Sequence, residues 1–349
     1  MKRQKRNPEK FEVIDLYAAL ARDNNYQLAV DEDVESFIGK IRDSLKASFN
    51  NDSLLHGRRV ESLFPYVAGA LGRCCMIKQE DSGNQFSDGL EIQSPDYVVI
   101  LKDGQRFFVE VKNCSRSDPK YLYPLKKDYV ERLENYAKLH GAILKFAIYF
   151  SKFNKWVLIS KEYLTEQKNR YVTSFLYAMA INEMAVLGDR MIGSKPFTMV
   201  LVADQNKPAF IDDNSQAQFI ISDIKFYCDG LEIVDSEEKR IAFYLIRFGS
   251  FTESKAVALY DGDQLFGVKI DYNHERPAEN QSFNIIGELS SMVSRSHSEH
   301  IIKDGKLIYL DTQVDPEIFS VVIPVNYKSD RFPIYQMTLQ PNPEFKVHD

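Results

Sequence analysis

The sequence predicts an α/β core, a mixed sheet flanked by helices, followed by a β-rich α+β region. Between residues 51 and 165, helical spacing of apolar residues alternates with short apolar strand runs, and after residue 165 strand-like runs dominate. A chain of 349 residues, 44% hydrophobic and 27% charged, can build a real core and is long enough for two domains. We expect a helical segment at 1–50, a core domain at 51–165 and a β-rich domain at 166–349.

Helices are expected at the start of the chain. Apolar residues in 34–45 recur every three or four positions behind the acidic run DEDVE, which suits a helix N-terminus. A less regular helix is expected at 11–22, and another at 60–71, after the polar break NNDS.

The core elements follow in the order strand, hairpin, helix, strand, strand. They are expected at 74–78, 96–112, 125–141, 142–150 and 155–160. Gly141 stands where a C-terminal cap belongs, so the helix should end there.

The second half contains many strand-like runs and two expected helices, at 172–187 and 284–293. The strands are expected at 197–204, 217–227, 240–248, 255–261, 265–272, 306–311 and 319–325.

The hairpin SPDYVVILKDGQRFFVEVKN carries charged residues inside apolar strands. A three-residue loop at 102–104, with Gly104 in the left-handed conformation, pairs Leu101 with Gln105 and Asp96 with Glu110. Because side chains alternate along a strand, Glu110 and Lys112 point to the same face. This register brings Asp96, Glu110 and Lys112 together.

Two facing carboxylates in covered strands need compensation, because burying an ionised group costs several kcal/mol unless it is paired or bound to a metal. Oxygen ligands from Asp96 and Glu110, completed by water, suit Mg²⁺, for which Mn²⁺ can substitute. Lys112 would lie close enough to contact a metal-bound water. This combination fits metal-assisted hydrolysis of a phosphodiester.

The spacing acid-x-Lys alone carries no weight, because it recurs elsewhere in the chain. Only Glu110 combines it with apolar strands, an upstream Pro-Asp at hairpin distance and a following basic amphipathic helix. The nearest rival is Asp223 with Lys225, whose upstream acids lie in the turn-like segment DDNS. The histidines His56, His140, His297 and His300 are expected to be structural or exposed.

Pro95-Asp96 followed by Glu110-Val111-Lys112 resembles the PD-(D/E)XK nuclease superfamily, which includes restriction endonucleases and Holliday-junction resolvases. The resemblance spans about residues 55–160 and implies a restriction-endonuclease-like fold. It implies metal ligation by Asp96, Glu110 and the Val111 carbonyl, while Lys112 positions or deprotonates the attacking water.

Two further positions depart from the family pattern. Tyr129 stands where resolvases frequently have Gln, and it is either a phosphate or water ligand or a core residue. Glu61 occupies the place of a helix Glu found in many members, and it is either a further metal ligand or a solvated acid next to Pro65.

The resemblance implies an endonuclease that cuts DNA rather than RNA, in bacterial restriction or defence. Double-strand cutting needs two active sites and so favours a homodimer. The β-rich domain at 166–349 would then serve target recognition, dimerisation or the sensing of a signal. Arg116, Lys120, Lys126 and Lys127 could contact backbone phosphates, or they form ordinary solvated surface. Residues 1–165 carry 26 Lys and Arg against 23 Asp and Glu, whereas the remainder carries 18 against 27.

Two rival functions remain. One is a non-catalytic nucleic-acid-binding protein, and the other is an effector whose second domain binds a small-molecule or protein activator. Four cysteines without CxxC spacing indicate a reducing compartment and no structural metal. No signal-peptide core or long apolar stretch is present, so we expect no membrane association and a cytoplasmic protein.

Overall fold

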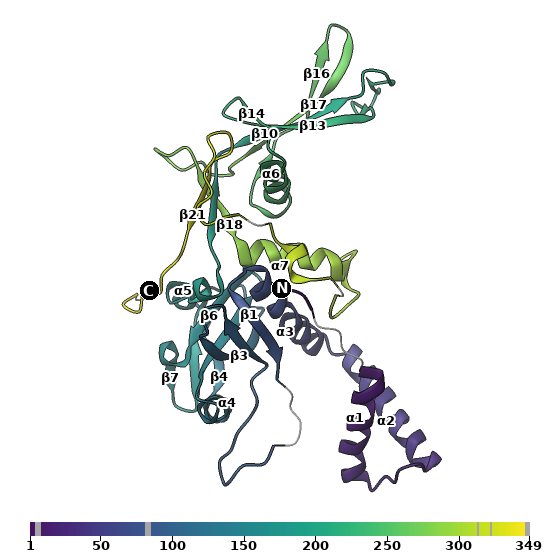
Figure 1. The fold of residues 1–349 in the computed structure, drawn as a ribbon, viewed down its shortest axis with the longest axis vertical. Coiled ribbons are helices and arrows are strands. Elements are labelled where there is room, and N and C mark those ends of the chain that lie inside the picture. The colour runs from purple at the N-terminus through teal and green to yellow at the C-terminus, as the bar shows by residue number, and fades with distance from the viewer. Residues whose placement is uncertain (4–7, 81–84, 313, 322, 346–349) are drawn as a thin grey trace.

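The computed structural model describes residues 1–3, 8–80, 85–312, 314–321 and 323–345. Its first two helices, α1 (Pro8–Asn24) and α2 (Asp31–Phe49), form a hairpin that projects from the rest of the chain (Figure 1). Helix α3 (Asp52–Ala70) begins behind Asn51, whose side chain accepts a hydrogen bond from the Leu54 amide at 3.0 Å. The three helices expected in this region are confirmed, each a little longer than predicted.

A five-stranded mixed sheet follows, in the order β1-β2-β3-β5-β6. Its strands are β1 (Cys74–Gln79), β2 (Tyr97–Leu101), β3 (Arg106–Cys114), β5 (Ile143–Phe150) and β6 (Lys155–Ser160). Only β3 and β5 run parallel, and helix α4 (Lys127–Leu139) connects them. Helix α4 packs on one face of the sheet, whereas α3 packs on the other face together with α7 (Leu289–Ile301) (Figure 1).

The β2–β3 hairpin has the predicted register. Val98 pairs with Phe108 and Val99 with Phe107. The loop closes with hydrogen bonds from the Gly104 amide to the Leu101 carbonyl and from the Leu101 amide to the Gln105 carbonyl. Gly104 has φ +86°, a conformation that costs glycine little. Both faces of these strands are apolar and buried, as expected for a covered sheet.

The helix after the hairpin starts later than predicted. Leu125 lies on β4 (Tyr123–Lys126), which joins β8 (Arg170–Thr173) and β7 (Thr165–Gln167) in a small antiparallel sheet. Helix α4 buries Val130, Leu133 and Ala137. Gly141 follows its C-cap with φ +60°, as the sequence predicted.

Beyond residue 165 the described chain forms two further sheets of three or more strands and three α-helices. The larger sheet contains β10 (Phe197–Ala203), β13 (Ile221–Cys228), β14 (Leu231–Ile233), β15 (Thr252–Glu253), β16 (Val257–Asp261) and β17 (Gln264–Asn273). The smaller sheet contains β9 (Met191–Ser194), β18 (Asn284–Glu288) and β21 (Ile334–Met337). The helices are α5 (Phe175–Ala180), α6 (Ser236–Phe248) and α7.

Short elements complete this region. They are the 3₁₀ turns η1 (Lys161–Tyr163), η2 (Met184–Leu187) and η3 (Pro316–Phe319), and the strand pairs β11 (Phe210–Ile211) with β12 (Ala217–Gln218) and β19 (Ile302–Lys303) with β20 (Lys306–Leu307).

Of the helix predicted at 172–187, only the short helix α5 and the 3₁₀ turn η2 form. Residues 170–173 pair with β4 instead, and Ser174 caps the short helix α5. The Asn182 side chain then accepts hydrogen bonds from the Leu158 and Met184 amides, which ends helical pairing before η2.

The strand predicted at 240–248 is wrong, because this segment belongs to α6. Asp235 caps that helix by accepting from the Glu237 and Glu238 amides. Ile241, Ala242 and Leu245 form its buried face. The apolar run of this segment resembles a strand, but its spacing is helical.

Three further expectations need correction. The helix expected at 284–293 is strand β18 followed by the first part of α7. Of the strand expected at 306–311, only Lys306–Leu307 pairs. The strand expected at 319–325 includes residue 322, which lies outside the described residues, and its described part contains the end of η3 and no strand.

One hydrophobic cluster crosses the predicted boundary at residue 165. It contains Phe64 of α3 and Trp156 of β6 together with Val293 of α7 and Phe319 of η3. The Trp156 indole donates to Ser294 Oγ at 2.9 Å in the same cluster. The division into domains stays a prediction. Helix α3 packs against residues that precede position 165 and against residues that follow it.

No helix among the described residues is long and apolar enough to cross a membrane.

Candidate active site

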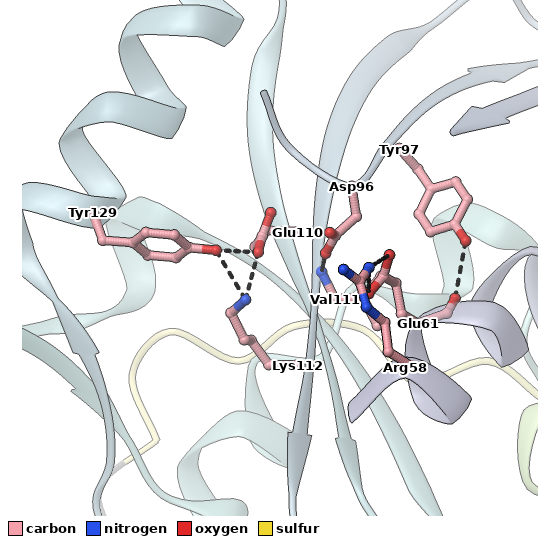
Figure 2. Close-up of polar contacts among 8 residues, drawn as sticks. All are labelled: Arg58, Glu61, Asp96, Tyr97, Glu110, Val111, Lys112 and Tyr129. Atoms are coloured by element: carbon pink, nitrogen blue, oxygen red, sulfur yellow. Dashed lines mark hydrogen bonds and ion pairs between the residues drawn. The ribbon is translucent and has the colours of Figure 1, made fainter. Parts of the chain in front are cut away.

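Asp96, Glu110 and Lys112 all line one open cleft of about 990 Å³, whose walls come from α3, β3, β4, α4 and the turn after β5. Asp96 directly precedes β2, and Glu110 and Lys112 lie on one face of β3. The hairpin register brings all three residues to this cleft, as predicted, but Asp96 does not lie on the same side of β3 as Glu110 and Lys112 (Figure 2). The lining residues include Asn51, Ser53, His56, Arg58, Arg59, Glu61, Asn113, Ser115, Tyr123, Tyr129, Ser151 and Lys152.

Glu110, Lys112 and Tyr129 form a closed polar triangle (Figure 2). Lys112 Nζ lies 2.5 Å from Glu110 Oε1 and 2.9 Å from Tyr129 Oη, and the Tyr129 hydroxyl donates to the same Glu110 oxygen. Glu110 is only 3% exposed. Burial alone would lower the pKa of Lys112, but the charge and hydrogen-bond interactions with Glu110 and Tyr129 together outweigh burial and raise that pKa, so the lysine is held as a cation.

Asp96 lies on the other side of the β3 backbone from this triangle (Figure 2). Its Oδ2 accepts a hydrogen bond from the Val111 amide at 2.7 Å. Burial, and secondly the Glu110 carboxylate, raise the pKa of Asp96 to about 7. The two carboxylates therefore repel one another across a site that excludes much of the solvent.

Glu61 also faces this cleft, from the middle of α3. Both of its carboxylate oxygens accept from Arg58 Nη1, at 2.9 and 3.0 Å, so the side chain is already paired. Pro65 removes the helical donor for the Glu61 carbonyl, yet α3 continues through it. The Tyr97 hydroxyl donates to that carbonyl at 3.1 Å and so joins α3 to β2 beside Asp96.

The donor set suits a hard divalent cation. Asp96 and Glu110 offer carboxylate oxygens, and the Val111 carbonyl lies between Glu110 and Lys112 along β3; all three are ligand types that Mg²⁺ accepts. The raised pKa of Asp96 marks a site where added positive charge would relieve repulsion. The described residues contain no group of three His, Cys, Asp or Glu side chains placed to hold a metal, so water would complete the coordination.

The basic residues of the cleft differ from those expected. Arg58, Arg59 and Lys152 line it, and Arg59 Nε is buried without a hydrogen-bond partner among the described residues. Sequence patterns did not single out these residues, because their position depends on how α3 packs against the sheet. Asn113, which is also unpredicted, lines the cleft with a buried Oδ1 that has no partner in the portion of the chain that the structure describes.

The four basic residues proposed from the sequence lie outside the lining of this cleft. Arg116 stacks over the Tyr121 ring at 5.2 Å, and Lys120 and Lys126 are exposed. Lys127 forms an ion pair with Glu166 of β7. Their role in nucleic-acid binding stays a prediction.

The rival acids do not form a comparable site. Asp223 lies exposed on β13, and Asp212 accepts hydrogen bonds from amides within its own turn. His297 is buried on α7 between the rings of Tyr66 and Phe319, and neither of its ring nitrogens has a partner in the described part of the chain. It is a buried core residue.

Comparison with known proteins leaves the family open. No family model and no curated protein matches the chain. Among solved structures, it is similar to Hjc, a Holliday junction resolvase from Archaeoglobus fulgidus, at 17% sequence identity and a TM-score of 0.24. The match covers 32% of this chain and 84% of that chain. At this score the similarity carries no argument, so the site stands on its own geometry.

Proposed function

We propose that the protein is a metal-dependent endonuclease and that Asp96, Glu110 and Lys112 form its active site. The observation that carries the proposal is the meeting of two carboxylates and a charged lysine in one open cleft. Burial and mutual repulsion raise the pKa of Asp96 to about 7, and perturbed carboxylates in a cleft are typical of functional sites.

Asp96, Glu110 and the Val111 carbonyl would hold Mg²⁺, or Mn²⁺ in its place. The bound cation would supply charge neutralisation at the phosphate and a water of lowered pKa. Glu61 could join this set only by leaving Arg58, to which both of its oxygens are bonded. We therefore assign Glu61 no ligand role in the first instance.

Lys112 orients the attacking water and donates a hydrogen bond to it in the proposed reaction. The lysine is charged and aimed by Glu110 and Tyr129, so its ammonium group has a fixed direction at the cleft surface. Tyr129 acts through Lys112 and Glu110 and is a positioning residue. This role replaces direct phosphate contact as our preferred interpretation of Tyr129.

The proposed substrate is DNA. Arg58, Arg59 and Lys152 line the same cleft as the carboxylates and add positive charge to it, which suits the phosphate backbone. These cations would hold a phosphodiester of the backbone close to the carboxylates. Arg116, Lys120, Lys126 and Lys127 would extend the contact beyond the cleft.

The first experiment is cleavage of supercoiled plasmid, single-stranded DNA and RNA with Mg²⁺ or EDTA at low salt. Wild type should cut DNA only with the metal, and Glu110→Ala should lose cutting. Lys112→Met should reduce the rate by about 10²–10⁴-fold. Asp223→Ala removes the acid of a surface acid-x-Lys segment and is the matched control that keeps full activity.

Each outcome has a definite meaning. If wild type and all variants bind DNA but none of them cuts it, the result would favour the non-catalytic alternative. Cutting that survives in Glu110→Ala but disappears in Asp223→Ala would move the site to β13. Cutting of RNA alone would overturn the DNA assignment while leaving the nuclease in place.

A further inference from the structure

The projecting α1–α2 hairpin buries very little of itself. Of the side chains described in residues 12–49, only Tyr17 and Phe37 are buried, and their rings pack edge to face at 5.2 Å. Short isolated helices are marginal in water, and most helical stability in proteins comes from packing an apolar face. Two buried rings are a small core for two helices of 17 and 19 residues.

Helix α2 carries an apolar stripe that the rest of the described chain leaves uncovered. Val34, Ile38, Leu45 and Phe49 are 37–63% exposed, and Ile41 lies among them along the helix. The spacing of four, three and four residues from Val34 to Leu45 is that of the a and d positions of a heptad. Such a seam normally packs against another helix. Figure 1 shows the α1–α2 hairpin extending away from the five-stranded sheet and from the sheets of the second half of the chain.

The charges beside the stripe allow two copies of α2 to attract each other when the two helices run antiparallel. The first turns of α2 hold Asp31, Glu32, Asp33 and Glu35, and its second half holds Lys40, Arg42 and Lys46 with one acid, Asp43. In an antiparallel pair that matches Val34 with Leu45 and Ile38 with Ile41 of the second copy, Glu35 lies beside the second copy's Arg42. The acidic end of each helix then faces the basic end of the other.

We propose that the α1–α2 hairpin is a homodimerisation surface, with the α2 helices of two copies packed antiparallel about a two-fold axis. Such an interface is isologous, because the same patch serves both subunits. A 19-residue helix is about 28 Å long and about 10 Å wide, so one flat face of the two-helix hairpin has an area of roughly 550 Å². That is of the order of the ~800 Å² per partner in a standard interface.

The proposal is independent of the chemistry at the cleft, because its readout is mass and not cleavage. Exposed apolar side chains on α1, namely Val13, Ile14 and Leu16, would widen the contact towards a four-helix arrangement. If the protein is a dimer without nuclease activity, the dimer proposal holds and the nuclease proposal fails. If it is an active monomer, the dimer proposal fails and the nuclease proposal holds.

The mass of the full chain, measured by sedimentation or light scattering, should be that of two copies. Ile38→Glu should reduce it to one copy without lowering helical content elsewhere, because Ile38 is 40% exposed within the single chain. Val257→Glu on β16, where the native residue is 52% exposed, is the matched control and should remain a dimer. A single-copy mass for wild type across the concentration range would refute the proposal.

Charge reversal tests the antiparallel register directly. Glu35→Arg and Arg42→Glu should each weaken dimerisation, because each puts like charges side by side. The double variant should regain the wild-type dissociation constant, and a mixture of the two single variants should form a mixed dimer. A double variant weaker than both single variants would mean that another partner covers this stripe.

Discussion

His297 gives the sharpest quantitative prediction, because it is a titratable side chain with no hydrogen-bond partner in the described structure. It is fully buried between Tyr66 and Phe319, and burial lowers its pKa from the usual 6.5 to about 4. Of the charged groups around it, Asp311 opposes this shift, whereas Arg59 and His300 reinforce it.

The unfolded chain protonates His297 near pH 6.5, and the folded chain only near pH 4. Between these values the unfolded state binds more protons, so stability falls as the pH falls. Each pKa unit corresponds to about 1.4 kcal/mol, so this side chain should cost about 3 kcal/mol between pH 7.5 and pH 4. His297→Phe fits the aromatic surroundings and should remove this loss.

The assay is urea denaturation of wild type and His297→Phe at several pH values from 7.5 to 4. Asp96 and Asp189, whose pKa values burial raises to about 7 and about 6, titrate in both proteins and cancel in the difference. A difference that is the same at every pH would reflect packing alone and would refute the reasoning. His300→Phe, at the exposed neighbour, should retain most of the wild-type pH dependence, because His300 contributes less to the shift than burial does.

Two further predictions concern buried polar contacts. Tyr97→Phe should destabilise the protein by about 1–2 kcal/mol, because it leaves the Glu61 carbonyl unpaired at Pro65; adding Pro65→Ala, which restores a helical donor, should recover part of the loss in a thermal melt. Lys145→Met should lower the free energy of unfolding by about 3–5 kcal/mol, because it removes the ammonium group that contacts the Glu183 carboxylate at 2.7 Å. The double variant Lys145→Met with Glu183→Leu should be less destabilised than the single variant. An undiminished loss in either double variant would contradict the assigned contact.

The hairpin could be predicted in detail because its chemistry is local. Asp103-Gly104 limits the loop, Gly104 tolerates φ +86°, and side-chain alternation then determines which residues face each other. The triangle with Tyr129 could not be predicted in the same way. It depends on the angle at which α4 packs on β3, and tertiary packing sets that angle.

Helix α6 shows where the sequence interpretation failed despite available information. The run RIAFYLIRF contains aromatic and β-branched residues, and the strand prediction followed from them. However, Asp235 and the two acids behind it form an N-terminal cap, and Ile241, Leu245 and Phe248 have helical spacing. The cap lies outside the apolar run, so the run by itself does not reveal the helix.

The basic residues of the cleft illustrate a different limit. Arg58 and Arg59 are consecutive on a helix, where neighbours point in directions about 100° apart, yet both reach the cleft. Their long side chains bend toward it, and that freedom leaves no periodic pattern in the sequence.

Trp156 is the only tryptophan of the chain, and it lies where residues from both sides of position 165 share one core. Its ring packs against Phe64 and Tyr149, and its indole donates to Ser294 of α7. The native protein therefore has one tryptophan whose fluorescence reports on the contact between the sheet and α7. Fluorescence of the unmodified chain should shift to longer wavelength as water reaches the indole, and so report when α7 separates from the sheet.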